Sequence, residues 1–469
     1  MNPQVTPTSS RDRETILETL VIQAELGQGD LVRAGVATLH PADVAELLNV
    51  LEEPELKQKI FNSLAPDLAS EVLSLVSSHT QEELTQELSN VTLGDLVERL
   101  DSDDAADLLA SLPEEQARAV LDQVPEELST EMEQLLRYPA DTAGGIMQTE
   151  HVAVPEGTRV DQAIEMIRSH IAEVPDIHNV FVVNQERRLV GVLPLRKLIL
   201  AQPDETVDKV MDRQVISARV DLDQEQVAQL FKRYDLVSLP VVDQQGVLLG
   251  RITIDDVVDV LEEEATEDLY KIVGVPQASV EKINLMSDPA LKRVRMRFSW
   301  ILITLTFELF VALVISKYFV TTIEKLAILA AFIPVIIAIA GNVGLQSSTL
   351  VVRSIALGSI GTISLSRAAR IVFSEARTGF ILGLICGVIT AAVGSFMNMS
   401  NPEVLKLTIS VFVGMVSALT AAATIGTIEP IFLHKLKQDP AVSSGPLITA
   451  VNDLMGTTMY LLVATFLQR

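Results

Sequence analysis

The sequence predicts a multidomain protein: an all-α superhelical N-terminal domain, an α/β tandem-repeat pair, an acidic connecting helix and a transmembrane domain of five α-helices. Three observations lead to this prediction. Residues 291–469 carry 14 Lys/Arg and 7 Asp/Glu, so the formal net charge of −26 divides into −33 before residue 291 and +7 after it. Long apolar runs begin at Phe298. A unit of roughly 60 residues also occurs twice within residues 144–262.

Charge and cysteine content exclude several functions. The acidic N-terminal part argues against nucleic acid as a partner, because a phosphate backbone repels such a surface. The single cysteine, Cys386, excludes a disulfide framework and a cysteine-based zinc site. The first thirty residues have no apolar core behind a basic start. We therefore expect no secretory signal peptide and an N-terminal part that stays in the cytosol.

Short helices are predicted over residues 14–138, after a disordered segment at residues 1–13. Proline turn signals punctuate this region, and the segment Leu39–Leu48 is echoed by Leu64–Leu73 and more loosely by Leu100–Leu109. Repeated short helices of this kind are typical of a stacked superhelix.

The internal repeat occupies residues 139–262, with units at about 144–200 and 207–262. The strand–turn–strand pattern of residues 180–193 recurs at residues 239–252, and each unit reads as helix, strand, turn, strand and helix. These units resemble a tandem pair of CBS domains. The resemblance implies α/β modules that pair face to face and often sense adenine nucleotides.

The densest acidic stretch, Asp255–Asp268, is predicted to lie on a connecting helix that leads, through a linker, over residues 263–297 to the membrane. Helical spacing places its carboxylates on neighbouring turns: Asp256 with Asp259, and Glu264 with Glu267 and Asp268. A charge run is usually only a solvated face. Here it leads from the repeat toward a basic segment, and crowded like charges repel unless a cation neutralises them. A divalent cation is the natural neutraliser.

The membrane domain is predicted over residues 298–469, because its apolar runs reach the length of about 20 residues that a spanning helix needs. We expect five spans, at about 298–316, 326–352, 378–400, 407–433 and 447–467. Basic residues are concentrated before span 1, between spans 2 and 3, and between spans 4 and 5. The positive-inside rule then places the N-terminal domains in the cytoplasm and the short C-terminus outside a plasma membrane.

Acidic residues inside the spans need an explanation, because charge at membrane depth is costly. Asp453 follows Thr449 and Asn452 well inside span 5, whereas Glu308 and Glu429 lie in spans 1 and 4. Buried acids usually mark ion paths, although interhelical packing is the alternative. Neither a Ser/His set nor a pair of carboxylates is expected at membrane depth, so we predict that the protein is not an enzyme.

Span 2 carries a second polar signal, Gly341, Asn342, Gly344 and Gln346. Asn342 and Gln346 are four residues apart and share a helical face. Carbonyls, amides and the Asp453 carboxylate form a hard-oxygen set suited to Mg²⁺. Ordinary packing of small residues between helices is the alternative.

The order of these parts, together with four motifs, closely resembles the MgtE family of magnesium channels. The motifs are Tyr138–Met147, Glu264–Asp268, Gly341–Gln346 and Asp439–Ala441. The resemblance covers nearly the whole chain beyond the first thirty or so residues. One departure is Gly445, where some members carry Asn beside the cytosolic gate.

The resemblance implies a homodimer whose pore is lined by spans 2 and 5, with Asp453 holding a hydrated Mg²⁺. The pore-lining positions are then Gly341, Asn342, Gly344, Gln346, Thr449 and Asn452. In the family, Mg²⁺ also binds between acidic cytosolic faces and locks the connecting helices over a closed pore. The matching residues are Asp103, Asp107, Asp223, Glu225, Asp235, Asp256, Asp259, Glu264, Glu267, Asp268 and Asp439. The CBS resemblance adds ATP as a regulator, without assigning its residues.

The resulting hypothesis is a Mg²⁺-selective channel for uptake across the plasma membrane, closed by cytosolic Mg²⁺. Its partners are then a second copy of the chain, membrane lipid and divalent cations. Two alternatives from other classes stay open. One is a divalent-cation carrier coupled to Na⁺ or H⁺, and the other is a membrane-tethered CBS nucleotide sensor that transports nothing.

Overall fold

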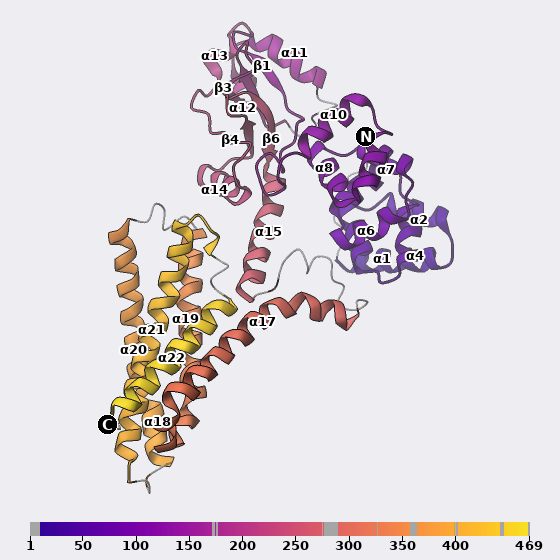
Figure 1. Cartoon of the computed structure of the whole chain (residues 1–469). Helices are drawn as coiled ribbons and strands as arrows, with labels where there is room; N and C mark the ends of the chain where they lie inside the picture. Colours follow the sequence, from indigo (N-terminus) through magenta and orange to yellow (C-terminus); the bar gives the residue numbers. More distant parts are fainter. Residues whose placement is uncertain are drawn as a thin grey trace. The chain divides into compact units, whose positions relative to one another are not determined.

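The computed structural model describes residues 10–170, 174, 177–273, 275, 289–325, 327–356, 364–397, 399, 402–440 and 445–467. The chain folds into two compact units, Met1–Glu262 and Glu263–Arg469. The first holds the helical domain and the α/β repeat, and the second holds the membrane helices, coloured orange to yellow in Figure 1.

Short helices form the N-terminal part of the first unit. They are α1 Ser10–Glu25, α2 Gly29–Val36, α3 Pro41–Val50, α4 Pro54–Phe61, α5 Pro66–Leu75, α6 Ser78–Gln86, α7 Asn90–Val97, α8 Ser102–Ser111, α9 Glu114–Leu121 and α10 Glu126–Leu135. Helices α3, α4 and α5 each begin with proline, which is tolerated at the first helical position because its missing N–H has no partner there. Helix α1 begins at Ser10, inside the segment expected to be disordered, and residues 1–9 lie outside the described residues.

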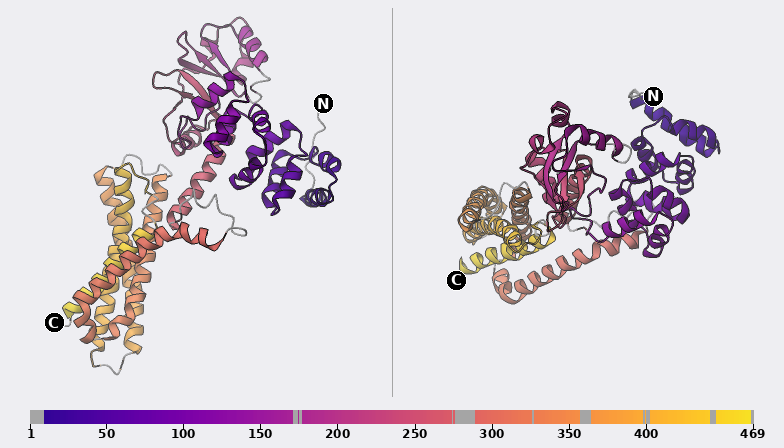
Figure 2. Two further views of the ribbon diagram at one scale, coloured as in Figure 1. Left: turned by 45° about the vertical axis from the view of Figure 1, so that its right-hand side comes forward. Right: turned by 90° about the horizontal axis from the view of Figure 1, so that it is seen from above.

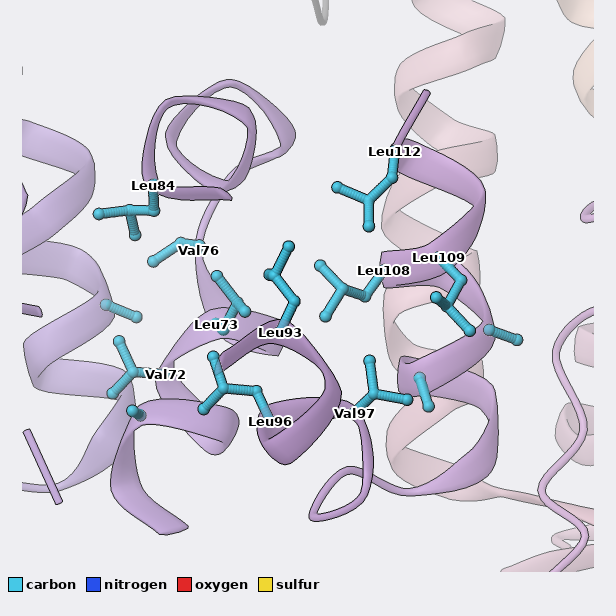
Figure 3. Close-up of a cluster of buried hydrophobic side chains, with 14 of the residues drawn as sticks. Val72, Leu73, Val76, Leu84, Leu93, Leu96, Val97, Leu108, Leu109 and Leu112 are labelled. Carbon is cyan, nitrogen blue, oxygen red and sulfur yellow. The ribbon is translucent and has the colours of Figure 1, made fainter. Parts of the chain in front are cut away.

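These helices stack as a superhelix, in which a helix packs on the one two places along the chain. Helix α5 contacts α3 and α7, and α4 contacts α2 and α6; Figure 2 shows the stack in indigo and purple. The buried side chains of successive helices meet between them, as Leu73, Leu93 and Leu108 do in Figure 3. Full burial of one such leucine contributes about 1.5–3 kcal/mol.

The two repeat units form two three-stranded sheets with the same topology, in which a parallel pair is followed by an antiparallel pair. The strands are β1 Ala153–Pro155, β2 Asn179–Val183 and β3 Leu189–Pro194 in one sheet, and β4 Ala218–Arg219, β5 Ser238–Val242 and β6 Leu248–Thr253 in the other. An irregularity in register falls at Val182/Val183 in the first and at Val241/Val242 in the second. The sequence repeat is therefore a structural repeat, the tandem CBS pair.

Helices cover and connect these sheets. They are α11 Val160–His170, α12 Leu195–Leu200, α13 Val207–Val210, α14 Gln224–Tyr234 and α15 Ile254–Val273. The acidic connecting helix is thus one continuous element, α15. Val257 and Val260 near its start are buried in the core of the first unit, so apolar packing anchors its N-terminal turns.

The second unit contains five helical segments long and apolar enough to span a membrane, as predicted. They are built from α17 Ala290–Val314, η1 Ile315–Phe319 and α18 Val320–Lys325; η2 Ala327–Phe332 and α19 Ile333–Ala356; α20 Leu365–Met397; α21 Val404–Lys435; and α22 Pro446–Leu467. Spans 1 and 3 begin earlier than expected, at Ala290 and Leu365. Hydropathy marks only the apolar part of a helix, and both helices continue through turns that carry arginines.

Glycines set the packing distance between two of these helices. Gly379, Gly383 and Gly387 recur every four residues on α20 and face α21. A Cβ on Gly383 would lie only 2.7 Å from Cα of Val416, so the two backbones approach as closely as small residues allow. Helix α17 crosses the bundle obliquely and packs against α22.

Candidate functional site

The polar centre of the membrane domain is on α22, at Asn452 and Asp453. Asp453 is 7% exposed and Asn452 is fully buried. Among the described residues, Oδ1 of Asp453 and both amide atoms of Asn452 have no hydrogen-bond partner. Buried polar atoms are rarely left unpaired, because each costs the full desolvation of that group. Unsatisfied oxygens at this depth are the chemistry that a cation satisfies.

Two glycines of helix α19, Gly341 and Gly344, lie against this polar centre. A Cβ on Gly341 would lie 3.7 Å from Oδ1 of Asp453. A Cβ on Gly344 would overlap the amide of Asn452, and one on Gly426 of α21 would overlap the Gly344 carbonyl. Close packing between helices therefore accounts for Gly344, and Gly341 borders the Asp453 carboxylate.

Polar residues on α19 also lie on an open face of the single chain. Asn342 and Gln346 are both exposed, in a stripe that continues to Ala338 and Leu350, whereas Thr449 on α22 is half-buried. Amides at membrane depth avoid lipid and face protein or water. This stripe therefore indicates a second protein surface or a water-filled path beside α19.

A second acid lies against Asp453. The carboxyl group of Glu308, well inside α17, interacts with that of Asp453. Our expectation that no pair of carboxylates occurs at membrane depth is therefore wrong. The sequence marked both acids separately, but their pairing depends on the packing of α17 on α22. Glu429, the third acid within the predicted spans, is half-buried on α21.

The first unit brings together two of the predicted carboxylates, Asp103 of α8 and Asp256 of α15. Asp103 is 8% exposed, and its Oδ1 has no hydrogen-bond partner among the described residues. Asp256 accepts hydrogen bonds from the Thr253 N–H at 3.1 Å, the Thr253 hydroxyl at 2.5 Å and the Gln148 amide at 3.4 Å. Burial and the negative charge of Asp256 raise the pKa of Asp103. The two carboxylates thus repel each other.

Sequence reasoning missed one neighbour of this pair, and another predicted residue of α8 lies on the exposed face. Asp104, which was not predicted, is half-buried beside the pair, and burial raises its pKa to about 7. Asp107 is exposed on the same helix. Helical spacing alone predicts which residues share a face, but which face is covered depends on the docking of α15. The side chain of Asp259, one turn along α15, is largely exposed. Partial burial of its carboxyl group and the charge of Glu262 nevertheless raise its pKa.

The three acids predicted in the second CBS repeat are divided between the two ends of α14. Asp223 caps its N-terminus and accepts a hydrogen bond from the Glu225 N–H at 3.0 Å. Asp235 ends the helix in the left-handed conformation, with φ of 51°. Eleven helical residues span about 16 Å. Asp235 therefore does not share a site with Asp223 and Glu225 within one chain.

The acidic end of α15 meets the last cytosolic loop through a lysine. Nζ of Lys271 lies 2.5 Å from Oε1 of Glu267 and 2.5 Å from Oδ2 of Asp439. Asp268 is half-buried nearby, and burial and the charge of Asp439 raise its pKa. Glu264 is half-buried one turn earlier. Lys271 was not predicted, although its spacing of four residues from Glu267 is the sequence signal for an ion pair.

No group of three or more His, Cys, Asp or Glu side chains in the described part of the chain is arranged to hold a metal ion. The acids meet as pairs, at Asp103 with Asp256 and at Glu308 with Asp453. Mg²⁺ commonly keeps several waters and binds through one or two carboxylates. Pairs of this kind fit a hydrated Mg²⁺ better than a fully dehydrated ion.

Comparison with known proteins agrees along the chain. Residues 333–463 match the MgtE divalent cation transporter profile, residues 39–141 match the MgtE intracellular N domain, and residues 143–204 and 207–263 match CBS domains. The magnesium transporter MgtE of Bacillus subtilis is 35% identical over 337 residues, which is 72% of each chain. The chain belongs to the MgtE family. The MgtE of Thermus thermophilus is 36% identical over 339 residues, again 72% of each chain.

A solved structure is similar to the cytosolic part. The crystal structure of the cytosolic domain of the Mg²⁺ channel MgtE in complex with ATP is 37% identical, covers 51% of this chain and 98% of that chain, and has a TM-score of 0.48. As an MgtE-family member with five candidate spans, the protein is a multi-pass membrane protein with cytosolic N-terminal domains.

Proposed function

We propose that this MgtE-family protein is a Mg²⁺ channel that carries magnesium into the cell and closes when cytosolic Mg²⁺ rises. The observation that carries the proposal is Asp453, a buried carboxylate at membrane depth with an oxygen that receives no hydrogen bond from the described residues. Hydrated Mg²⁺ supplies what this oxygen lacks, which is positive charge and water donors. The magnesium transporters among its relatives support the choice of ion.

The conducting form in this proposal is a homodimer with α19 and α22 of each copy beside the path. The support is the exposed stripe of Asn342 and Gln346, which is polar where lipid would otherwise lie. Two copies facing each other place these amides and both Asp453 carboxylates around one axis. A symmetric interface uses the same surface of both chains, so the single polar stripe on α19 can form both sides of the interface.

Closure by Mg²⁺ follows from the charge of the cytosolic part. The residues before 291 carry a net charge of −33, and the carboxylates of Asp103 and Asp256 repel each other. Cations bound by such carboxylates favour the compact arrangement, and a ligand shifts an equilibrium only by its differential affinity for the two states. Several weak sites acting together give a steep response. We assign this role to the predicted cytosolic acids, and ATP at the CBS pair is a further regulator.

The test is Mg²⁺ uptake by proteoliposomes that contain Asp453→Ala, compared with the wild type. The exposed Glu324→Gln variant, which removes an acid near the end of span 1, is the matched control for loss of one charge. We expect uptake to fall by about 10²-fold in Asp453→Ala, as for loss of a group that holds a metal ion through its outer shell, and to be unchanged in Glu324→Gln. Normal uptake by Asp453→Ala would rule out Asp453 as the pore site.

A further inference from the structure

Glu308 is an acidic residue of the membrane domain that the proposed function leaves unexplained. It lies on α17, outside the α19 and α22 pair proposed to border the pore, and its side chain is half-buried. Helix α17 packs against α22, and the carboxyl groups of Glu308 and Asp453 interact. In the described part of the chain, neither acid forms an ion pair with Lys, Arg or His.

A purely structural contact between these two groups is unfavourable. Two ionised carboxylates offer only acceptor oxygens, so their contact needs either a shared proton or a cation between them. Asp453 has an oxygen with no donor among the described residues, and Gly341 presents no side chain that could supply one. A glutamate that served only packing would be replaced without cost by an apolar residue at this depth. The arrangement is one that a bound cation stabilises.

We propose that Glu308 is a second carboxylate of the intramembrane cation site and sets its preference for divalent over monovalent ions. This inference rests on the proposed function of Asp453. Two carboxylates per chain double the negative charge around the ion, and charge count is a main determinant of divalent affinity. The longer glutamate side chain reaches from α17 to a hydrated ion at Asp453, through the ion's water shell.

The experiment measures flux into proteoliposomes of wild type, Glu308→Gln, Glu308→Asp and the control Glu324→Gln, with external Mg²⁺ varied and with K⁺ as the competing ion. In Glu308→Gln we expect the half-saturating Mg²⁺ concentration to rise by about tenfold, with a lower Mg²⁺ to K⁺ flux ratio. Glu308→Asp keeps the charge but shortens its reach, so its half-saturating concentration should lie between those of wild type and Glu308→Gln. Glu324→Gln should match the wild type.

Thermal unfolding of the purified proteins separates binding from folding. An unchanged half-saturating concentration and flux ratio in folded Glu308→Gln would overturn the inference. Wild-type flux that depends on a proton gradient, with that dependence lost and Mg²⁺ affinity unchanged in Glu308→Gln, would do the same, because it would make the pair a proton site. If Glu308→Gln does not fold, Glu308→Asp decides, and a wild-type half-saturating concentration contradicts the proposal. Wild-type protein that moves no Mg²⁺ would instead refute the proposed function.

Discussion

Two pairs of carboxylates, one in each unit of the chain, show how the same residue type is placed for different tasks. Asp103 and Asp256 meet in the cytosolic unit, where Asp256 accepts hydrogen bonds from Thr253 and Gln148. Glu308 and Asp453 meet in the membrane unit, where Oδ1 of Asp453 accepts none from described residues. Oδ1 of Asp103 likewise accepts none among the described residues, so each pair holds one unsatisfied oxygen. The difference is that Asp256 is hydrogen-bonded without a metal, whereas in the proposed function a cation balances the membrane pair.

A third arrangement differs from both, because it contains its own cation. Lys271 lies between Glu267 and Asp439 at the end of α15. An ammonium group there stabilises the contact between the connecting helix and the last loop without any metal. We therefore expect substitutions at the two carboxylate pairs to change the response to Mg²⁺ strongly, and substitutions at the Lys271 bridge to change it less.

The largest expected effect on regulation comes from neutralising the acidic end of α15. Combined Glu264→Gln, Glu267→Gln and Asp268→Asn substitutions remove the charges that cytosolic Mg²⁺ is proposed to neutralise. We expect proteoliposome flux to persist but to lose its inhibition by cytosolic Mg²⁺. Inhibition retained at the wild-type concentration would show that sensing does not depend on this part of the helix.

The next effect distinguishes a buried acid from an exposed one on the same helix. Asp103→Asn replaces a buried carboxylate, one oxygen of which has no hydrogen-bond partner among the described residues, with a neutral amide, whereas Asp107→Asn changes an exposed residue one turn away. Without Mg²⁺, we expect Asp103→Asn to stabilise the folded protein by about 1–3 kcal/mol and Asp107→Asn to change it little. Thermal unfolding in the presence of a chelator measures both changes in stability. Equal changes in the two variants would show that burial does not distinguish Asp103 from Asp107.

A pH dependence follows from the same residues. Burial raises the pKa of Asp104 to about 7, above its value of 3.8 when unfolded, so the folded state binds the proton more tightly. Stability without Mg²⁺ should therefore fall as pH rises from 6 to 8, by about 1 kcal/mol. Unfolding in buffered chelator tests this, with Asp104→Asn as the control that reduces the slope to the part contributed by Asp103, whose pKa burial raises to about 8. A stability that rises over this interval would contradict the assigned burial.

The smallest effect is expected at the lysine bridge. Lys271→Gln removes the resident positive charge and leaves Glu267 and Asp439 open to Mg²⁺. Partly exposed ion pairs contribute about 0.2–1 kcal/mol, so the half-inhibiting cytosolic Mg²⁺ concentration should shift downward by about twofold. Lys271→Arg, which keeps the charge, should behave as wild type. An upward shift in Lys271→Gln would mean that the lysine supports Mg²⁺ binding.

Sequence patterns were sufficient for the order of domains, the repeat and the spans. Apolar runs predict spans because lipid excludes unpaired backbone, and the strand–turn–strand pattern predicts the two sheets because its alternation matches the pleat. The sites were less predictable. The pairing of Glu308 with Asp453 requires the crossing of α17 over α22, and the separation of Asp235 from Asp223 requires the intervening α14 to be a continuous helix. Both depend on contacts that are distant in sequence or on the exact extent of an element.

The most direct test of the central claim is Mg²⁺ flux into proteoliposomes that contain the wild-type chain, measured while Mg²⁺ on the cytosolic side is varied. The account predicts flux that is steeply reduced as cytosolic Mg²⁺ reaches about the millimolar range typical of weak carboxylate sites, with no requirement for a Na⁺ or H⁺ gradient. Flux that is insensitive to cytosolic Mg²⁺, or that depends on a counter-ion gradient, would contradict it.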